Sequence, residues 1–101
     1  MITKKSFFKK VKKIKDPIKS IRGKLYKELY VNDKIFCFGI RCSTDTTFKV
    51  NLEKLYNAYR NNDKLNTKSE DLKYFKNAKC CSPAIAILMA TGLLKDGKTI
   101  K

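Results

Sequence analysis

Apolar residues near the start of the chain recur at the spacing of an α-helix. Successive members of this set are four, three, four, three and four residues apart, so they share one helical face while most lysines fall on other faces. The stripe consists of Phe7, Val11, Ile14, Ile18, Ile21 and Leu25. Asp16 and Pro17 interrupt it, because proline lacks the amide needed inside a helix but suits a first turn. The pattern predicts two short helices, over residues 4–15 and 17–23, with Gly23 ending the second.

Residues 25–41 are rich in aromatic and β-branched side chains, which is typical of two strands joined by a turn, here at Asn32 and Asp33. The first half also permits a helix, because Ile21, Leu25 and Leu29 share a four-residue spacing. In the second strand, over residues 34–41, apolar residues occupy both alternating sets of positions, which predicts burial on both faces. An exposed aromatic strand that stacks bases, as in RNA-recognition motifs, is the alternative. This strand departs from the glycine and aromatic order of that signature, so we expect its aromatic residues to lie in the core.

Two amphipathic stretches in the second half of the chain predict helices. After the polar loop of residues 42–47, the first helix covers residues 50–60, with Asn51 as candidate N-cap. Its apolar stripe is Leu52, Leu55, Tyr56 and Tyr59. A second, shorter helix begins after Ser69 and turns Leu72 and Phe75 inward.

A third helix is apolar on every side, so it should form the centre of the core. Ser82 is its candidate N-cap, Pro83 its first helical residue and Gly92 its stop. Beyond it, residues 95–98 predict a turn that leads to an edge strand at residues 99–100. The fold class expected is α+β: a small single domain with a short β-hairpin packed by two or three helices, preceded by a cationic amphipathic helical N-terminal arm.

The distribution of charge divides the chain. The 101 residues hold 24 Lys+Arg against 9 Asp+Glu, a formal net charge of +15. Residues 1–24 contain ten basic residues and one acid, a net of +9, which leaves +6 for the rest. This clustering predicts a basic amphipathic arm over residues 1–24 and a small α+β body over residues 25–101. The basic residues of the arm are Lys4, Lys5, Lys9, Lys10, Lys12, Lys13, Lys15, Lys19, Arg22 and Lys24.

Lysine outnumbers arginine by 21 to 3, and this ratio bears on what the charge does. Arginine presents a rigid fork that reads base edges, whereas lysine is a flexible, hydrated point charge. The composition therefore favours attraction to a polyanion over sequence reading. Codon bias of an AT-rich genome also enriches lysine, but it does not by itself gather cations at one end of a chain.

Three interpretations of the arm stay open. Its apolar stripe packs on the body of the same protein or on a neighbouring chain, with lysines in solvent. Alternatively, the arm inserts among phosphates of RNA or DNA, or lies against an acidic protein face in a large assembly. The third is attachment to a membrane surface through Phe7 and Phe8 with the lysine face.

Catalytic and metal-binding chemistry is poorly supported. The chain has no histidine, which excludes His-based triads and mixed Cys/His zinc sites. Cys37, Cys42, Cys80 and Cys81 match the number of ligands in a structural zinc site, but adjacent Cys80 and Cys81 do not suit tetrahedral coordination. We expect buried thiols instead, in a reducing compartment. Cys81 precedes a helix start but has no base, so we predict no catalytic residue and no cofactor.

These observations favour a non-enzymatic structural or assembly component. It would dock by its lysine-rich arm onto a large polyanionic assembly, such as a ribosome-like particle or a virion, through sequence-nonspecific contacts with nucleic acid or an acidic protein surface. Other protein chains are expected partners. The alternative is a phage accessory protein that acts purely by protein–protein contact, as a capsid-stabilising protein or an inhibitor of a host factor. A membrane span requires about 20 consecutive apolar residues, and the sequence has no such run. We expect a cytoplasmic or virion location rather than secretion.

Overall fold

The computed structural model describes residues 2–15, 17–19, 23–32, 36–66 and 78–101. Its described helices are α1 (Lys4–Lys12), α2 (Leu52–Asn61) and α3 (Ala78–Ala90). An antiparallel sheet in the order β1-β2-β3-β4 is formed by β1 (Ile18–Lys19), β2 (Leu25–Asn32), β3 (Phe36–Arg41) and β4 (Thr47–Asn51). A small hairpin consists of β5 (Leu94–Lys95) and β6 (Lys98–Thr99).

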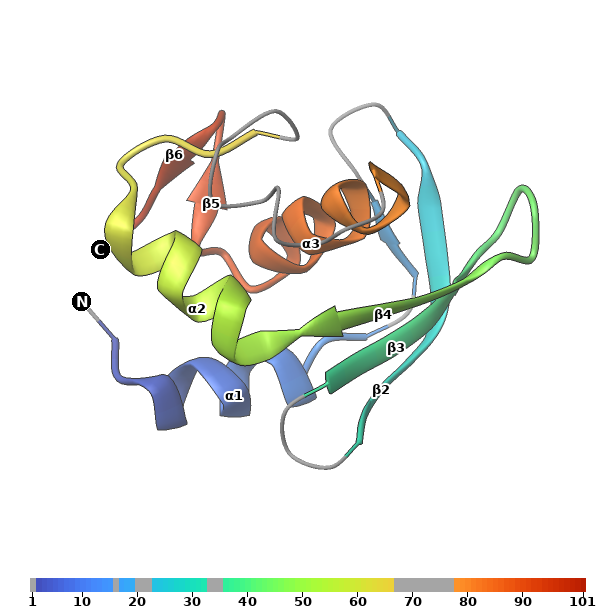
Figure 1. The fold of residues 1–101 in the computed structure, drawn as a ribbon, viewed down its shortest axis with the longest axis horizontal. Helices are drawn as coiled ribbons and strands as arrows, with labels where there is room; N and C mark the ends of the chain where they lie inside the picture. The colour runs from blue at the N-terminus through green and yellow to red at the C-terminus, as the bar shows by residue number, and fades with distance from the viewer. Residues whose placement is uncertain (1, 16, 20–22, 33–35, 67–77) are drawn as a thin grey trace.

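The elements form a small α+β domain, which confirms the expected fold class at that level. In Figure 1, α3 lies across one face of the four-stranded sheet, and α1 and α2 lie side by side at the end of it. The inner face of the sheet contributes Tyr26, Cys37, Phe48 and Val50 to the core, each at most 7% exposed. From α3 come Ala84, Ile85, Ala86, Ile87 and Leu88, each at most 1% exposed. The apolar helix is therefore central to the core, as expected.

The predicted hairpin is confirmed, with β2 and β3 paired from Tyr26 opposite Arg41 to Asn32 opposite Phe36.

Strand β4 was not expected from the sequence; it pairs along β3. The buried residues of β4 are Phe48 and Val50. Two alternating apolar residues are a weak strand signal, and the helical spacing that follows them overlaps it. That helix, α2, begins one residue after Asn51, whose side-chain oxygen accepts a hydrogen bond from the Lys54 amide at 3.1 Å. The predicted cap is therefore correct.

The N-terminal segment differs from the expectation in two ways. The first predicted helix is present as α1, but the second is wrong where the structure describes it, because Ile18 and Lys19 form β1. Ile18 pairs with Tyr26 on β2. Gly23, at a φ of 84°, lets the chain turn back so that Ile18 and Lys19 pair with β2. Pairing with the next strand along the chain thus overrides the local helical spacing.

A separate cationic arm is not confirmed. Phe7 and Val11 of α1 and Ile18 of β1 are 0%, 3% and 4% exposed and belong to the same core cluster as α2 and α3. The Phe7 ring lies 5.4 Å from that of Tyr56, and the Tyr56 hydroxyl donates to the carbonyl oxygen of Ile2 at 2.8 Å. The described part of residues 1–24 is therefore built into the domain.

The start of α3 also differs from the prediction. The helix begins at Ala78, so Pro83 lies inside it instead of at its first position. A proline at that position removes one main-chain hydrogen bond, but Pro83 is buried in the core, and its apolar burial offsets the loss. The helix ends as predicted, with Gly92 at a φ of 78°. Asp96 and Gly97, at φ values of 53° and 79°, form the tight turn between β5 and β6.

The C-terminal residues are hydrogen-bonded to α2. The Tyr59 hydroxyl donates to the carbonyl oxygen of Ile100 at 2.6 Å. Burial raises the pKa of Tyr59 above its ordinary value of 10.0, and the neighbouring Tyr56 raises it further, so the phenol keeps the proton of this bond at neutral pH.

The short helix expected after Ser69, with Leu72 and Phe75 turned inward, lies outside the described residues.

Candidate nucleic-acid interface

Helix α1 has one face in the core and the opposite face in solvent. Thr3 caps it, because the Thr3 hydroxyl accepts from the Ser6 amide at 3.1 Å. The helix then places Phe7 and Val11, four residues apart, against α2. Basic residues fill its last turn, where they complement the partial negative charge of the helix C-terminus. The side chains that point outward are consequently held on a fixed backbone.

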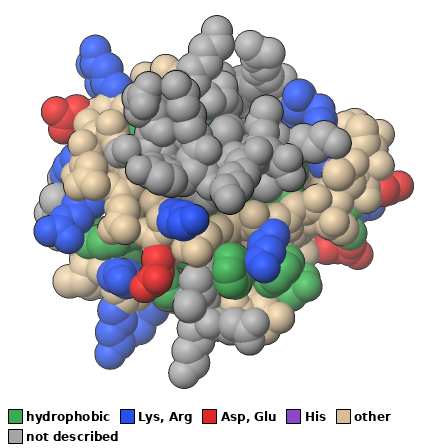
Figure 2. Space-filling model, viewed as in Figure 1, with side chains coloured by type: hydrophobic (Ala, Val, Ile, Leu, Met, Phe, Trp, Pro, Cys, Tyr) green, Lys and Arg blue, Asp and Glu red, His purple; other side chains and the backbone are tan. Residues whose placement is uncertain are grey.

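The outward face of α1 carries Lys5, Lys9 and Lys12, which we call the lysine ridge. All three are exposed, and their spacing of four and three residues aligns them along one side of the helix. Figure 2 shows Lys and Arg side chains projecting at the lower left, where α1 lies in Figure 1. Cations in one row along a rigid helix can contact successive phosphates of a polyanion without first ordering the backbone.

The remaining predicted basic residues have different surroundings. Lys4 forms an ion pair of 3.0 Å with Glu53 on α2, with both side chains about half exposed, 51% and 47%. Lys24 is half-buried, and Arg22 lies outside the described residues. The exposed residues are Lys10, Lys13, Lys15 and Lys19. Lys4 thus helps to hold α1 on the domain, whereas the others extend the positive surface around the ridge.

The predicted partner-packing stripe is corrected by the structure. Phe7, Val11 and Ile18 fill the core of their own chain, and half-buried Ile14 packs against that core, because an amphipathic helix in a small domain buries its apolar face on the nearest body. These four side chains are not available to a partner. Leu25 is 42% exposed, and Ile21 lies outside the described residues.

The expectation that the aromatic residues of β3 lie in the core is also wrong. Cys37 and Gly39 point to the buried side, while Phe36 and Phe38 are half-buried on the other side of the sheet. Neither phenylalanine belongs to the core cluster or to the residues packed against it. The sequence does hold a signal for this arrangement, because alternate positions of β3 differ in size. The small residues Cys37 and Gly39 leave room for α3 and Phe48 on the inner face, so the large rings face outward.

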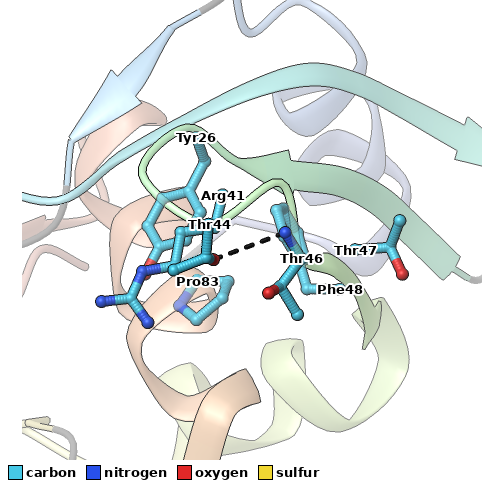
Figure 3. A pocket seen from close by; sticks show the side chains of 7 residues that line it. All are labelled: Tyr26, Arg41, Thr44, Thr46, Thr47, Phe48 and Pro83. Atoms are coloured by element: carbon cyan, nitrogen blue, oxygen red, sulfur yellow. Dashed lines mark hydrogen bonds between the residues drawn. The ribbon is translucent and has the colours of Figure 1, made fainter.

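A cavity of about 150 Å³ lies at the end of the sheet near α3 (Figure 3). Arg41 is the one charged residue among those that line it, together with Thr44, Thr46 and Pro83. Within the described structure the Arg41 Nε is buried without a hydrogen-bond partner, while Thr44 Oγ accepts from the Thr46 amide at 3.4 Å. The cavity has room for water or a small anion, but its lining brings no acid or base beside Arg41.

Two of the four cysteines have described side chains. Cys37 is 2% exposed in the core, and Cys42 is half-buried just after β3. Cys80 and Cys81 lie in the first turns of α3, but their side chains are outside the described part of the structure. Among the described residues no three side chains of His, Cys, Asp or Glu gather closely enough to hold a metal ion.

Comparison of the chain with protein-family models, curated proteins and solved structures found no match. Within the described ranges, no helix has both the length and the apolar character needed to cross a bilayer. The function is therefore inferred from the side chains of this chain alone.

Proposed function

We propose that the protein is a non-enzymatic component that docks onto a large nucleic-acid-containing assembly, such as a ribosome-like particle or a virion, through the lysine surface of its first 24 residues. The observation that carries this proposal is the lysine ridge on α1, a row of exposed cations on a helix whose other face is locked into the core. Phosphate contacts of this kind supply affinity and position without reading sequence.

The makeup of the surface supports a phosphate backbone as the ligand. Lysines dominate it, and lysine contacts a phosphate as a point charge without a fixed geometry. The ridge is anchored by Phe7 and Val11, so little conformational entropy is lost when the lysines meet the polyanion. Glu53 is paired with Lys4 and not with a lysine of the ridge.

The proposal predicts steep dependence of binding on salt. The full chain is titrated with labelled RNA and DNA oligonucleotides of unrelated sequence at about 50 and about 200 mM salt. If only the three ridge lysines contact phosphates, the affinity for a duplex falls about fortyfold between these conditions, because each contact contributes about 0.9 to the slope of log affinity against log salt. For a single strand each contact contributes about 0.7, and the fall is about eighteenfold. Affinities for the different sequences stay within a few-fold of one another. Affinity that is unaffected by salt, or absence of binding at the lower salt concentration, contradicts the proposal.

A further inference from the structure

The sheet carries a cluster of aromatic side chains on the face opposite the core. Tyr30 of β2 is 57% exposed and stands directly opposite Phe38 of β3. Their rings are stacked, with centroids 5.1 Å apart and planes 14° from parallel. Phe36 lies beside them, its ring centroid 6.3 Å from that of Phe38. We call Tyr30, Phe36, Phe38 and Lys49 the outer face; Figure 2 shows hydrophobic side chains gathered below centre, in the region that β3 and β4 occupy in Figure 1.

This exposure is built into the strand pattern. The small residues Cys37 and Gly39 occupy the inner positions of β3, and a Cβ at Gly39 would lie 2.5 Å from the Phe48 ring. The large rings are therefore confined to the outer positions. The stacked Tyr30 and Phe38 rings stabilise the pairing of β2 with β3, and the solvent-facing part of such a cluster is a candidate contact surface.

A hollow of about 320 Å³ adjoins the stacked pair. The residues that line it are Glu28, Tyr30, Phe38, Gly39, Ile40, Thr47 and Phe48. Glu28 lies in a bulge of β2, where the register shifts between Lys27 and Tyr30 and Glu28 takes a φ of 53°. The apolar members of this lining suit the flat face of a base better than an anion.

Positive charge lies directly beside the rings. The Lys49 ammonium is 4.1 Å from the centroid of Phe36 and 5.9 Å from that of Phe38. Lys49 is exposed, so its flexible side chain can reach a phosphate next to a base that stacks on the outer face. Aromatic rings combined with lysine are the recurrent surface for unpaired nucleotides, because every base has a π-face and every nucleotide a phosphate.

We propose that the outer face binds the unpaired bases of single-stranded nucleic acid, by stacking on Tyr30 and Phe38 with Lys49 on the adjoining phosphate. This inference rests on the proposed function and specifies its ligand, because bases inside a duplex are already stacked and cannot lie flat on the sheet. The lysine ridge binds phosphates of either form, whereas the outer face distinguishes single strands from duplexes.

The test compares the full-length protein with Tyr30→Ala and Phe38→Ala variants. Each is titrated with a labelled single-stranded oligonucleotide and with the duplex of the same sequence. The expected result is a loss of single-strand affinity of about tenfold or more for each variant, with duplex affinity unchanged. Tyr30→Phe keeps the ring and should retain wild-type binding. Ile100→Ala, at a residue 46% exposed in the C-terminal segment, is the control for removal of exposed apolar surface.

A second measurement covers the case in which a variant unfolds. Ultraviolet crosslinking of the wild-type protein to a bromouracil-containing single strand, followed by peptide mapping, should place crosslinks at Tyr30 or Phe38. Unchanged single-strand affinity in folded variants, equal losses for single strand and duplex, or crosslinks confined to α1 overturn the inference while leaving salt-dependent polyanion binding intact. Dimerisation that Tyr30→Ala abolishes without affecting nucleic-acid affinity also overturns it. Absence of any nucleic-acid binding by the wild type overturns the proposed function as well.

Discussion

Replacing Lys5, Lys9 and Lys12 with glutamine lowers the affinity for duplex DNA by about eightfold for each lysine that contacts a phosphate at about 0.1 M salt. If all three make contact, the combined loss is about 500-fold, and the slope of log affinity against log salt becomes shallower by about 2.7. The three side chains are exposed, and glutamine is a good helix former, so the fold and its thermal stability stay close to wild type. Titrations at several salt concentrations measure both quantities.

The matched control removes the same charge elsewhere. Lys64, Lys95 and Lys98 are exposed residues on or beside the β5–β6 hairpin, which lies away from α1 in Figure 1. Their replacement by glutamine also subtracts three from the formal charge of +15. If affinity depends on total charge alone, the two triple variants lose equally. We expect the control to lose severalfold at most, and equal losses would show that α1 is not the docking element.

Removal of the Phe7 ring should strongly destabilise the domain. Phe7→Ala is expected to lower the free energy of unfolding by about 3–5 kcal/mol, because the ring is fully buried and lies within 5.4 Å and 6.5 Å, centroid to centroid, of Tyr56 and Tyr59. A domain of this size has about 5–15 kcal/mol in total, so the substitution removes a large share of the stability of the fold. Urea unfolding followed by circular dichroism measures the change.

Phe8→Ala is the internal control for this substitution. Phe8 is the next residue on the same helix but is only half-buried at the edge of the core, so its loss should cost distinctly less. If Phe7→Ala unfolds at the same urea concentration as wild type, α1 is not part of the core and the first 24 residues do behave as an arm. The same packing means that deletion of residues 1–24 removes core side chains, so charge substitutions are the better probe of binding.

Local signals in the sequence predicted several elements correctly. Asn51 caps α2, Gly92 stops α3, and the aromatic and β-branched residues of 25–41 form the β2–β3 hairpin. In each case the deciding interaction lies within a few residues of the signal: a side chain bonding a nearby amide, a positive φ, or a neighbouring strand. The lysine spacing of α1 is a local signal of the same kind.

The features that sequence reasoning missed depend on how the elements pack against one another. Ile18 looks like the continuation of a helical stripe, but its strand partner, Tyr26, lies beyond a turn at Gly23. The outward position of Phe36 and Phe38 depends on what α3 and Phe48 leave room for on the inner face, and spacing alone cannot assign a face to an apolar strand. Docking of α1 on α2 likewise requires Tyr56 and Tyr59, some fifty residues away.

Lysine footprinting shows which lysines a bound nucleic acid covers. The full chain is acetylated with and without a saturating single-stranded oligonucleotide, and the rate at each lysine is read by peptide mass spectrometry. We expect bound nucleic acid to slow acetylation severalfold at Lys5, Lys9 and Lys12, while exposed Lys95 and Lys98 on the β5–β6 hairpin react as in the isolated protein. Unchanged rates along α1, or protection centred on Lys95 and Lys98, would contradict this expectation.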